Sequence, residues 1–182
     1  MIRTAILLAS GFEEVEALTA VDLLRRAGLG CDMLSAEDCA TVTGSHGIGV
    51  LADRNFSETD FSEYDAVILP GGLPGTDHLQ QDPRVISLLQ TFSGQGKLIA
   101  AICAAPRLLS KAGLLNGKNV VCYPAMEELL TEAQVFQESV MTDGQIITSR
   151  GVGTAIDFSL AIIAHLLGAE KAEQIAKSIV YR

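Results

Sequence analysis

The sequence predicts an α/β fold in which helices cover both faces of a mostly parallel sheet. Short apolar runs rich in valine and isoleucine alternate with longer amphipathic segments, which is the pattern of βαβ units. The chain has 182 residues, of which 48% are hydrophobic and 19% are charged. This length and composition suit a single domain over residues 1–182, with enough interior for a sheet between two helical layers.

The first elements alternate in the expected order. Residues 4–8 are an apolar run and predict a buried strand. Residues 14–27 predict a helix, because their apolar positions repeat at three-residue steps, and Gly28 is placed to end it. A second strand is expected over residues 31–35, followed by an irregular stretch over residues 43–49.

The rest of the chain continues this alternation. Further strands are predicted over residues 66–69, 98–102, 119–122 and 145–148. Further helices are predicted near residues 84–92, from Cys103 onward, and over residues 154–167 and 171–180. A turn rich in glycine and proline occupies residues 70–75. We find no internal repeat and no linker.

Charge and apolar run length exclude several classes of protein. The net charge of −9 opposes binding to nucleic acid phosphates. No apolar run reaches the roughly 18 residues that a membrane span needs. Because acidic residues follow the first apolar run so closely, the N-terminus is unlike a signal peptide, and a cytoplasmic location is predicted.

The cysteines do not form a known metal or redox motif. Their spacing lacks the CxxC and Cys/His patterns of zinc sites and redox pairs, so we expect reduced thiols in a cytosolic chain. We also expect neither a metal nor a cofactor, because no P-loop or GxGxxG pattern is present. The four residues are Cys31, Cys39, Cys103 and Cys122.

Cys103 is the strongest candidate for chemistry. It follows the apolar run 98–102 and precedes two alanines and Pro106, a residue that suits the first turn of a helix. A thiol at this junction resembles a nucleophile elbow, and a helix N-terminus would lower its pKa. From the local residues alone, a small buried hydrophobe explains Cys103 equally well.

Three other segments follow predicted strands or begin predicted helices. Residues 11–17 carry three acids, of which Glu13 and Glu14 are explained as solvated residues favoured by the helix dipole. Glu16 is expected to share a crevice with Cys103 beyond the carboxyl ends of the strands. Glycines at 71 and 72 allow backbone N–H groups to approach an oxyanion, although a bare turn is the simpler interpretation.

The last of these segments is residues 149–154, which we interpret as a helix start and a packing contact. Taken together and in order, four segments resemble the ThiJ/PfpI superfamily, in its Parkinson-associated protein deglycase (DJ-one) branch, which is glyoxalase III-like. The resemblance implies a flavodoxin-like (Rossmann-like) three-layer sandwich of the class I glutamine amidotransferase type, assembled as a homodimer. The four segments are residues 11–16, 69–72, 100–106 and 149–154.

The resemblance also implies roles for individual residues. The reactive cysteine of the family falls on Cys103. The family's acid, which is protonated and hydrogen-bonds the sulfur, falls on Glu16. The backbone N–H groups that hold an oxygen on the substrate or on the oxidised sulfur fall on Gly72 and Ala104.

Two pocket positions depart from the family's animal members. Tyr123 stands where those members have a histidine near the cysteine, and His46 stands where they have an arginine that comes from the partner subunit. The protease-like branch has a histidine directly after the cysteine, where this chain has Ala104. A cysteine peptidase is therefore disfavoured for want of a base.

Two classes of function remain open on the sequence. The first is a cofactor-independent enzyme that converts reactive dicarbonyls, such as methylglyoxal to lactate, or that repairs glycated protein. In this reaction Cys103 is the nucleophile and Glu16 moves a proton between adjacent carbons. The second is a redox-sensing or chaperone-like stress protein that acts through oxidation of Cys103. Neither class requires a nucleic acid or a membrane as partner.

Overall fold

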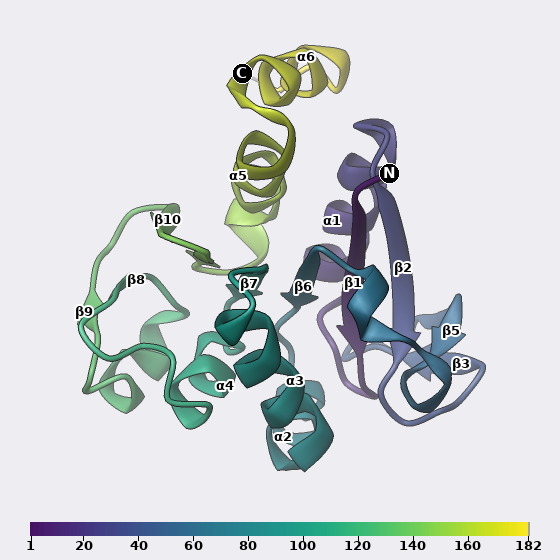
Figure 1. Cartoon of the computed structure of the whole chain (residues 1–182), viewed down its shortest axis with the longest axis vertical. Coiled ribbons are helices and arrows are strands. Elements are labelled where there is room, and N and C mark those ends of the chain that lie inside the picture. The colour runs from purple at the N-terminus through teal and green to yellow at the C-terminus, as the bar shows by residue number, and fades with distance from the viewer. Residues whose placement is uncertain (182) are drawn as a thin grey trace.

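A seven-stranded sheet forms the centre of the protein in our computed structural model, which describes residues 1–181 (Figure 1). Its strand order is β10-β11-β7-β6-β1-β2-β5. All neighbouring strands are parallel except the edge pair β10 and β11. The strands are β1 (Arg3–Leu8), β2 (Gly30–Ser35), β5 (Arg54–Asn55), β6 (Ala66–Leu69), β7 (Leu98–Ile102), β10 (Val140–Asp143) and β11 (Ile146–Ser149).

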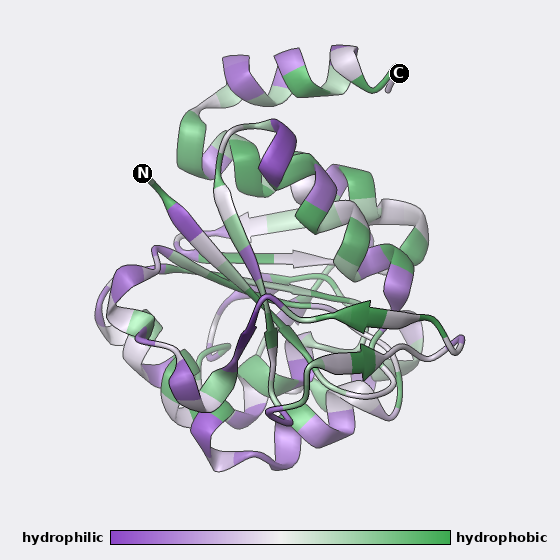
Figure 2. Ribbon diagram, turned by 90° about the vertical axis from the view of Figure 1, so that its right-hand side faces the viewer, coloured by the Kyte–Doolittle hydropathy of each residue, from purple (hydrophilic) through white to green (hydrophobic). Residues whose placement is uncertain are grey.

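Helices cover both faces of this sheet, so the predicted α/β class and three-layer architecture are confirmed (Figures 1 and 2). One layer contains α1 and α5, with α6 packed on α5. The other contains α2, α3 and α4. The helices are α1 (Glu14–Arg26), α2 (Gly75–Gln81), α3 (Pro83–Gly94), α4 (Pro106–Lys111), α5 (Ala155–Leu167) and α6 (Ala169–Ser178). No helix within residues 1–181 has the length and apolar character needed to cross a membrane.

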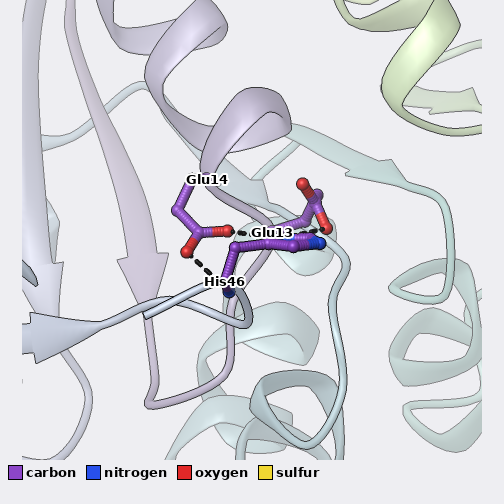
Figure 3. Close-up of side chains that lie close together, drawn as sticks. All are labelled: Glu13, Glu14 and His46. Atoms are coloured by element: carbon purple, nitrogen blue, oxygen red, sulfur yellow. Dashed lines mark hydrogen bonds and ion pairs between the residues drawn. The ribbon is translucent and has the colours of Figure 1, made fainter. Parts of the chain in front are cut away.

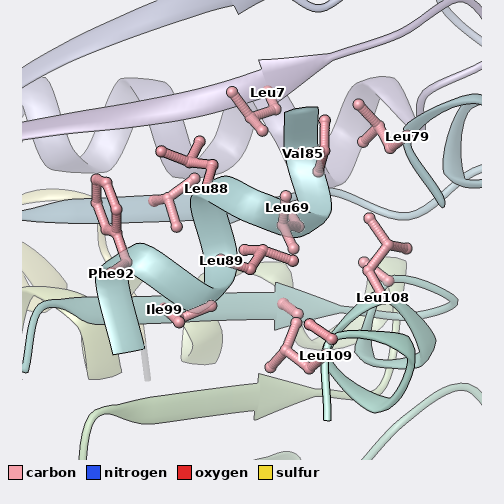
Figure 4. Packing of buried hydrophobic residues seen from close by; sticks show 14 of the residues in the cluster. Leu7, Leu69, Leu79, Val85, Leu88, Leu89, Phe92, Ile99, Leu108 and Leu109 are labelled. Carbon is pink, nitrogen blue, oxygen red and sulfur yellow. The ribbon is translucent and has the colours of Figure 1, made fainter. Parts of the chain in front are cut away.

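The central strands are buried on both faces, which explains their continuous apolar runs. Successive side chains of a strand point to opposite faces. In β1, Leu7 joins the cluster under α3, where Leu88 and Leu89 pack against Leu69 of β6 (Figure 4). Its neighbour Ile6 joins the second cluster, under α1 and α5.

Several elements differ from the prediction. The predicted strand 119–122 is short and pairs outside the central sheet, as β8 (Asn119–Val120) with β9 (Gln134–Val135). The stretch predicted as irregular includes the turn of a hairpin between β3 (Thr41–Thr43) and β4 (Gly49–Leu51). Helix α2 begins within the turn-rich segment, where glycine and proline mask its start. The short 3-10 helices are Phe56–Glu58, Phe61–Glu63, Pro124–Leu129 and Val152–Thr154.

The connections after β1, β6 and β7 place three loops at one edge of the sheet. These strands are neighbours and run parallel, so their carboxyl ends open into a common crevice. The loop after β1 leads to Glu16, the loop after β6 contains Gly72, and the loop after β7 begins with Cys103. The topology therefore brings together segments that are far apart in the sequence.

Candidate active site

The backbone of Cys103 turns sharply at the end of β7. Its φ of 65° lies in the left-handed region, which is uncommon for a residue with a side chain. Hydrogen bonds hold this conformation on both sides: the Cys103 N–H donates to the Ser149 carbonyl over 3.0 Å, and the Tyr123 N–H donates to the Cys103 carbonyl over 2.9 Å. The elbow is therefore fixed by two other segments of the chain.

The helix after the elbow begins later than the sequence predicts. Residues 103–105 form a turn, and α4 starts at Pro106 and has six residues. The prediction that Cys103 opens a helix is wrong. A short helix that begins three residues away gives the sulfur little support from a helix dipole, because that effect is confined to the terminal turn.

Glu16 lies on the first turn of α1, and its side chain is fully buried beside the elbow. Its Oε2 accepts a hydrogen bond from the Gly71 N–H over 2.8 Å. Its Oε1 is buried without a hydrogen-bond partner among the residues that the structure describes. Burial raises the pKa of Glu16 to about 7, although the Gly71 N–H and the Cys103 thiol both oppose this rise.

The Cys103 thiol and the Glu16 carboxyl group are close enough for each to shift the pKa of the other, so they compete for a proton. Burial, followed by the negative charge of Glu16, raises the pKa of Cys103 to about 12, while the N–H groups of Ala104 and Gly72 lower it. This direction is opposite to the one predicted from a helix N-terminus. A thiolate at Cys103 is favoured only when Glu16 holds the proton, because two adjacent buried charges of the same sign repel each other.

The turn of Gly71 and Gly72 packs tightly against the start of α1. Glu13 N–H donates to the Gly71 carbonyl over 2.9 Å. Gly72 has a φ of 92°, and a side-chain carbon there would lie 2.3 Å from the Glu13 nitrogen. A side-chain carbon at Gly71 would lie 2.6 Å from Cys103 Cβ. Both positions therefore require glycine for the backbone to approach the sulfur and the carboxyl group.

The loop after β11 forms the opposite side of the site. Gly151 N–H donates to Thr154 Oγ1 over 3.1 Å, and Thr154 N–H donates to the Gly151 carbonyl over 2.9 Å. Thr154 Oγ1 also lies 2.7 Å from Ser149 Oγ. These bonds fix Gly151 across from Cys103 and Glu16.

A pocket of about 960 Å³ opens between these segments. Cys103 is partly exposed in it, and Tyr123, with 47% of its surface exposed, forms part of its wall. Ala104 is buried and does not line the pocket, but its backbone N–H group interacts with the Cys103 sulfur. The residues that line it include Glu16, His46, Gly72, Cys103, Tyr123 and Gly151.

At the rim of the pocket, Glu14 is a buried carboxylate and His46 an exposed imidazole (Figure 3). Glu14 Oε1 accepts hydrogen bonds from the N–H groups of His46, over 2.8 Å, and Ile48, over 3.4 Å. Glu14 Oε2 lies 3.0 Å from His46 Nδ1. These bonds lower the pKa of Glu14 to about 2 despite its burial. The interpretation of Glu14 as a solvated residue is wrong.

The same rim contains a cluster of carboxylate and imidazole groups, which are residue types that can bind a metal ion. Ligand atoms of Glu13, Glu14 and His46 lie within 4.8 Å of one another. Carboxylate and imidazole groups are common zinc ligands. However, both oxygens of Glu14 already accept hydrogen bonds from the 44–48 turn. The arrangement therefore serves to clamp that turn onto α1.

The structure thus brings Cys103, Glu16, Gly72 and the Ala104 N–H to one point. Tyr123 flanks them, whereas His46 stands at the rim, paired with Glu14. The sequence did not predict the contacts that Gly71, Gly151 and Glu14 make in the structure. Gly71 and Gly151 lie in the segments 69–72 and 149–154, which the sequence singles out, but the atoms that they contact belong to distant parts of the chain. Glu14 gave no local signal because its partners are more than 30 residues away.

Comparison with known proteins gives matches over nearly the whole chain. The model of the DJ-1/PfpI family matches residues 2–165. Protein dj-1beta of Drosophila melanogaster is 38% identical over 177 residues, covering 96% of this chain and 95% of that protein. Its crystal structure superposes with a TM-score of 0.96 at 37% identity, covering 100% of this chain and 98% of that one.

Two other matches have names that state an activity or an oxidised form. The glutathione-independent glyoxalase DJR-1.2 of Caenorhabditis elegans is 31% identical over 169 residues, covering 92% of this chain and 89% of that protein. The structure of oxidised DJ-1 from Toxoplasma gondii has a TM-score of 0.94 at 35% identity, covering 100% of this chain and 99% of that one.

Proposed function

This chain belongs to the DJ-1/PfpI family, and from that premise we propose that it is a cysteine-dependent, cofactor-independent glyoxalase of the cytoplasm that converts reactive dicarbonyls in stress protection. The observation that carries the proposal is the placement of a partly exposed sulfur beside a buried carboxyl group, one oxygen of which has no hydrogen-bond partner within residues 1–181. A relative named as a glutathione-independent glyoxalase supports the same reaction class.

The proposed reaction begins with the thiolate of Cys103, formed while Glu16 holds the proton. The sulfur adds to the aldehyde carbon of methylglyoxal and forms a C–S bond, and the carbonyl oxygen becomes an oxyanion. The N–H groups of Gly72 and Ala104 point toward the sulfur and are placed to stabilise that oxyanion. The oxyanion takes the proton from Glu16, which gives a hemithioacetal and leaves Glu16 as a carboxylate.

Glu16 then carries the proton transfer. Its carboxylate removes the hydrogen from the carbon bound to sulfur and returns a proton to the neighbouring carbon, which was the ketone. The hydroxyl proton of the hemithioacetal passes to the former ketone oxygen, so the carbon bound to sulfur becomes the thioester carbonyl. The product is a thioester of lactate, and water cleaves its C–S bond to release lactate and the thiol. The sequence is an internal redox reaction, so it needs no external oxidant, metal or nucleotide. A carboxyl group with a pKa near 7 suits both transfers.

The test is a lactate assay on purified protein supplied with methylglyoxal and no glutathione. Wild-type protein should form lactate, and Cys103→Ser should lose nearly all of the activity, because a serine hydroxyl is a far weaker nucleophile. Cys39→Ser is a matched control at an exposed cysteine. Equal activity of wild type and Cys103→Ser would refute the proposal. Repair of glycated protein by the same site is tested with a methylglyoxal-treated peptide.

A redox-sensing role, with chaperone-like protection of clients, is the second candidate. The Gly72 and Ala104 N–H groups that face the Cys103 sulfur are equally suited to hold the oxygens of a sulfinate, and a relative has been crystallised in oxidised form. Mild peroxide treatment followed by peptide mass spectrometry should then find sulfinate first at Cys103. Earlier oxidation of Cys39, which is exposed, would count against this role.

We further propose that the chain forms a two-fold symmetric homodimer. Val15 on α1 and Val152 beside the pocket are 48% and 47% exposed, and exposed apolar surface of this kind is typical of interfaces. Light scattering at micromolar concentration should give about twice the chain mass of 19.2 kDa. A monomer would exclude any contribution of His46 to a neighbouring pocket.

A further inference from the structure

Gly151 faces the reacting groups across one corner of the pocket. A side-chain carbon at Gly151 would lie 3.6 Å from Tyr123 Cδ2, 3.9 Å from Glu16 Oε1 and 4.0 Å from Cys103 Sγ. All three separations are ordinary van der Waals contacts. A methyl group beside Gly151 would therefore touch the aromatic ring, the Glu16 carboxyl oxygen and the sulfur at once.

Neither the backbone nor the packing requires glycine at this position. Gly151 has a φ of 161°, which is an extended conformation open to any residue. Its N–H and carbonyl groups bond to Thr154, and a side chain would not disturb these bonds. Gly71 and Gly72 differ, since a side-chain carbon at either would lie under 3 Å from neighbouring atoms. Glycine at position 151 therefore leaves space beside the Cys103 sulfur that a side chain would fill.

The proposed reaction indicates which group of the substrate would occupy the space beside Gly151. When the Cys103 sulfur adds to the aldehyde carbon of a 2-oxoaldehyde, the substituent on the ketone carbon is three bonds from the sulfur. Standard bond lengths place that substituent about 4 Å from the sulfur. This matches the distance from Cys103 Sγ to the position beside Gly151. The same position lies next to Glu16 Oε1, which must reach the two reacting carbons.

We propose that Gly151 is a specificity-determining residue, and that the space between it and Tyr123 is the subsite for the substituent on the ketone carbon. This inference rests on the proposed glyoxalase function. It names the substrate class as 2-oxoaldehydes with an uncharged substituent, such as methyl, that fills the contact between Gly151 and Tyr123. Glyoxal, which has hydrogen in place of the methyl group, leaves the subsite unfilled.

The test compares kcat/KM for methylglyoxal and for glyoxal in wild type and Gly151→Ala. The added methyl group occupies the subsite, so the ratio of methylglyoxal to glyoxal should fall about tenfold or more, since a methylene-sized change in a pocket is worth roughly 10- to 200-fold. Gly94→Ala on α3, where a side-chain carbon meets nothing within 4 Å, should keep the wild-type ratio. An unchanged ratio in folded Gly151→Ala would overturn the inference.

A second measurement separates this inference from the proposed function. If wild type converts neither dicarbonyl, the glyoxalase proposal fails, and the subsite is then tested by the rates at which Cys103 is modified. Iodoacetamide must place carbon beside the sulfur, whereas hydrogen peroxide is smaller. Gly151→Ala should slow alkylation about tenfold and peroxide oxidation less than about twofold. Alkylation at the wild-type rate would show that the space beside Gly151 does not control access to Cys103.

Discussion

Glu14 and Glu16 stand two residues apart on the first turn of α1, and both are buried, yet their surroundings give them opposite properties. The pKa of Glu14 falls to about 2, whereas that of Glu16 rises to about 7. Burial raises the pKa of each group. What differs is the number of hydrogen-bond donors that face the carboxylate.

Glu14 faces the 44–48 turn, which supplies two backbone N–H groups, the Ser45 hydroxyl and the His46 ring. These donors more than offset its desolvation. Glu16 faces the pocket and receives the Gly71 N–H at one oxygen, while its other oxygen has no partner among the described residues. The same residue type therefore anchors a turn at one position and, two residues later, has a pKa near neutrality beside the Cys103 sulfur.

Among substitutions of these two acids, we expect Glu16→Gln to have the largest effect, and the quantity affected is the turnover of methylglyoxal. Glutamine keeps the shape of the side chain but cannot transfer a proton. Turnover of methylglyoxal should therefore fall roughly 10²-fold or more, since positioned proton transfer is typically worth 10²- to 10⁴-fold. Lactate formation measures the loss, and alkylation of Cys103 confirms that the thiol is still accessible. Full turnover in this variant would remove Glu16 from the mechanism.

The two acids should also give folding stability opposite dependences on pH. Glu16 ionises near pH 4.5 when unfolded and near pH 7 when folded, so the free energy of unfolding should fall as pH rises from 4.5 to 7, by up to about 3 kcal/mol. Glu14 ionises near pH 4.5 when unfolded and near pH 2 when folded. Its contribution is present above pH 4.5 and is lost as pH falls toward 2.

Urea unfolding at a series of pH values separates these contributions. Glu16→Gln should flatten the curve between pH 4.5 and 7, and Glu14→Gln should flatten it between pH 2 and 4.5. Curves that remain parallel to wild type in both windows would contradict the assigned directions of the two pKa shifts.

A smaller effect is expected on stability in Glu14→Gln at neutral pH. The glutamine oxygen can still accept from the His46 and Ile48 N–H groups, but the carboxylate charge that strengthens these bonds is lost, and the amide NH2 replaces the oxygen that accepts from the Ser45 hydroxyl and the His46 ring. This should cost about 2 kcal/mol, measured as a lower midpoint of urea unfolding. Glu13→Gln, at a neighbouring carboxyl group that receives no backbone N–H bond in the described structure, is the matched control and should change the midpoint much less.

The contrast also shows how far the sequence alone reaches. The buried strands were predictable because β1, β6 and β7 are apolar on both faces, and the order of strands and helices placed Cys103 and Glu16 at one sheet edge. The late start of α4 at Pro106 could not be predicted, because alanine and proline are compatible with either a turn or a helix. The raised pKa of Cys103 was missed because burial beside a carboxyl group depends on segments that lie far apart in the chain.

The smallest effect is expected for His46→Ala, and it should depend on pH. His46 is 68% exposed at its side chain and pairs with Glu14 over 3.0 Å, so its pKa is raised, chiefly by the hydrogen bond to Glu14. A raised folded-state pKa stabilises the fold below pH 6.5, and that contribution disappears as pH rises through the raised value. Wild type should therefore unfold at a slightly higher urea concentration than His46→Ala at pH 5.5, and the two midpoints should converge above pH 8. A constant difference at both pH values would mean that the ring acts through packing rather than through its charge, and that the backbone N–H groups hold the Glu14 carboxylate without it.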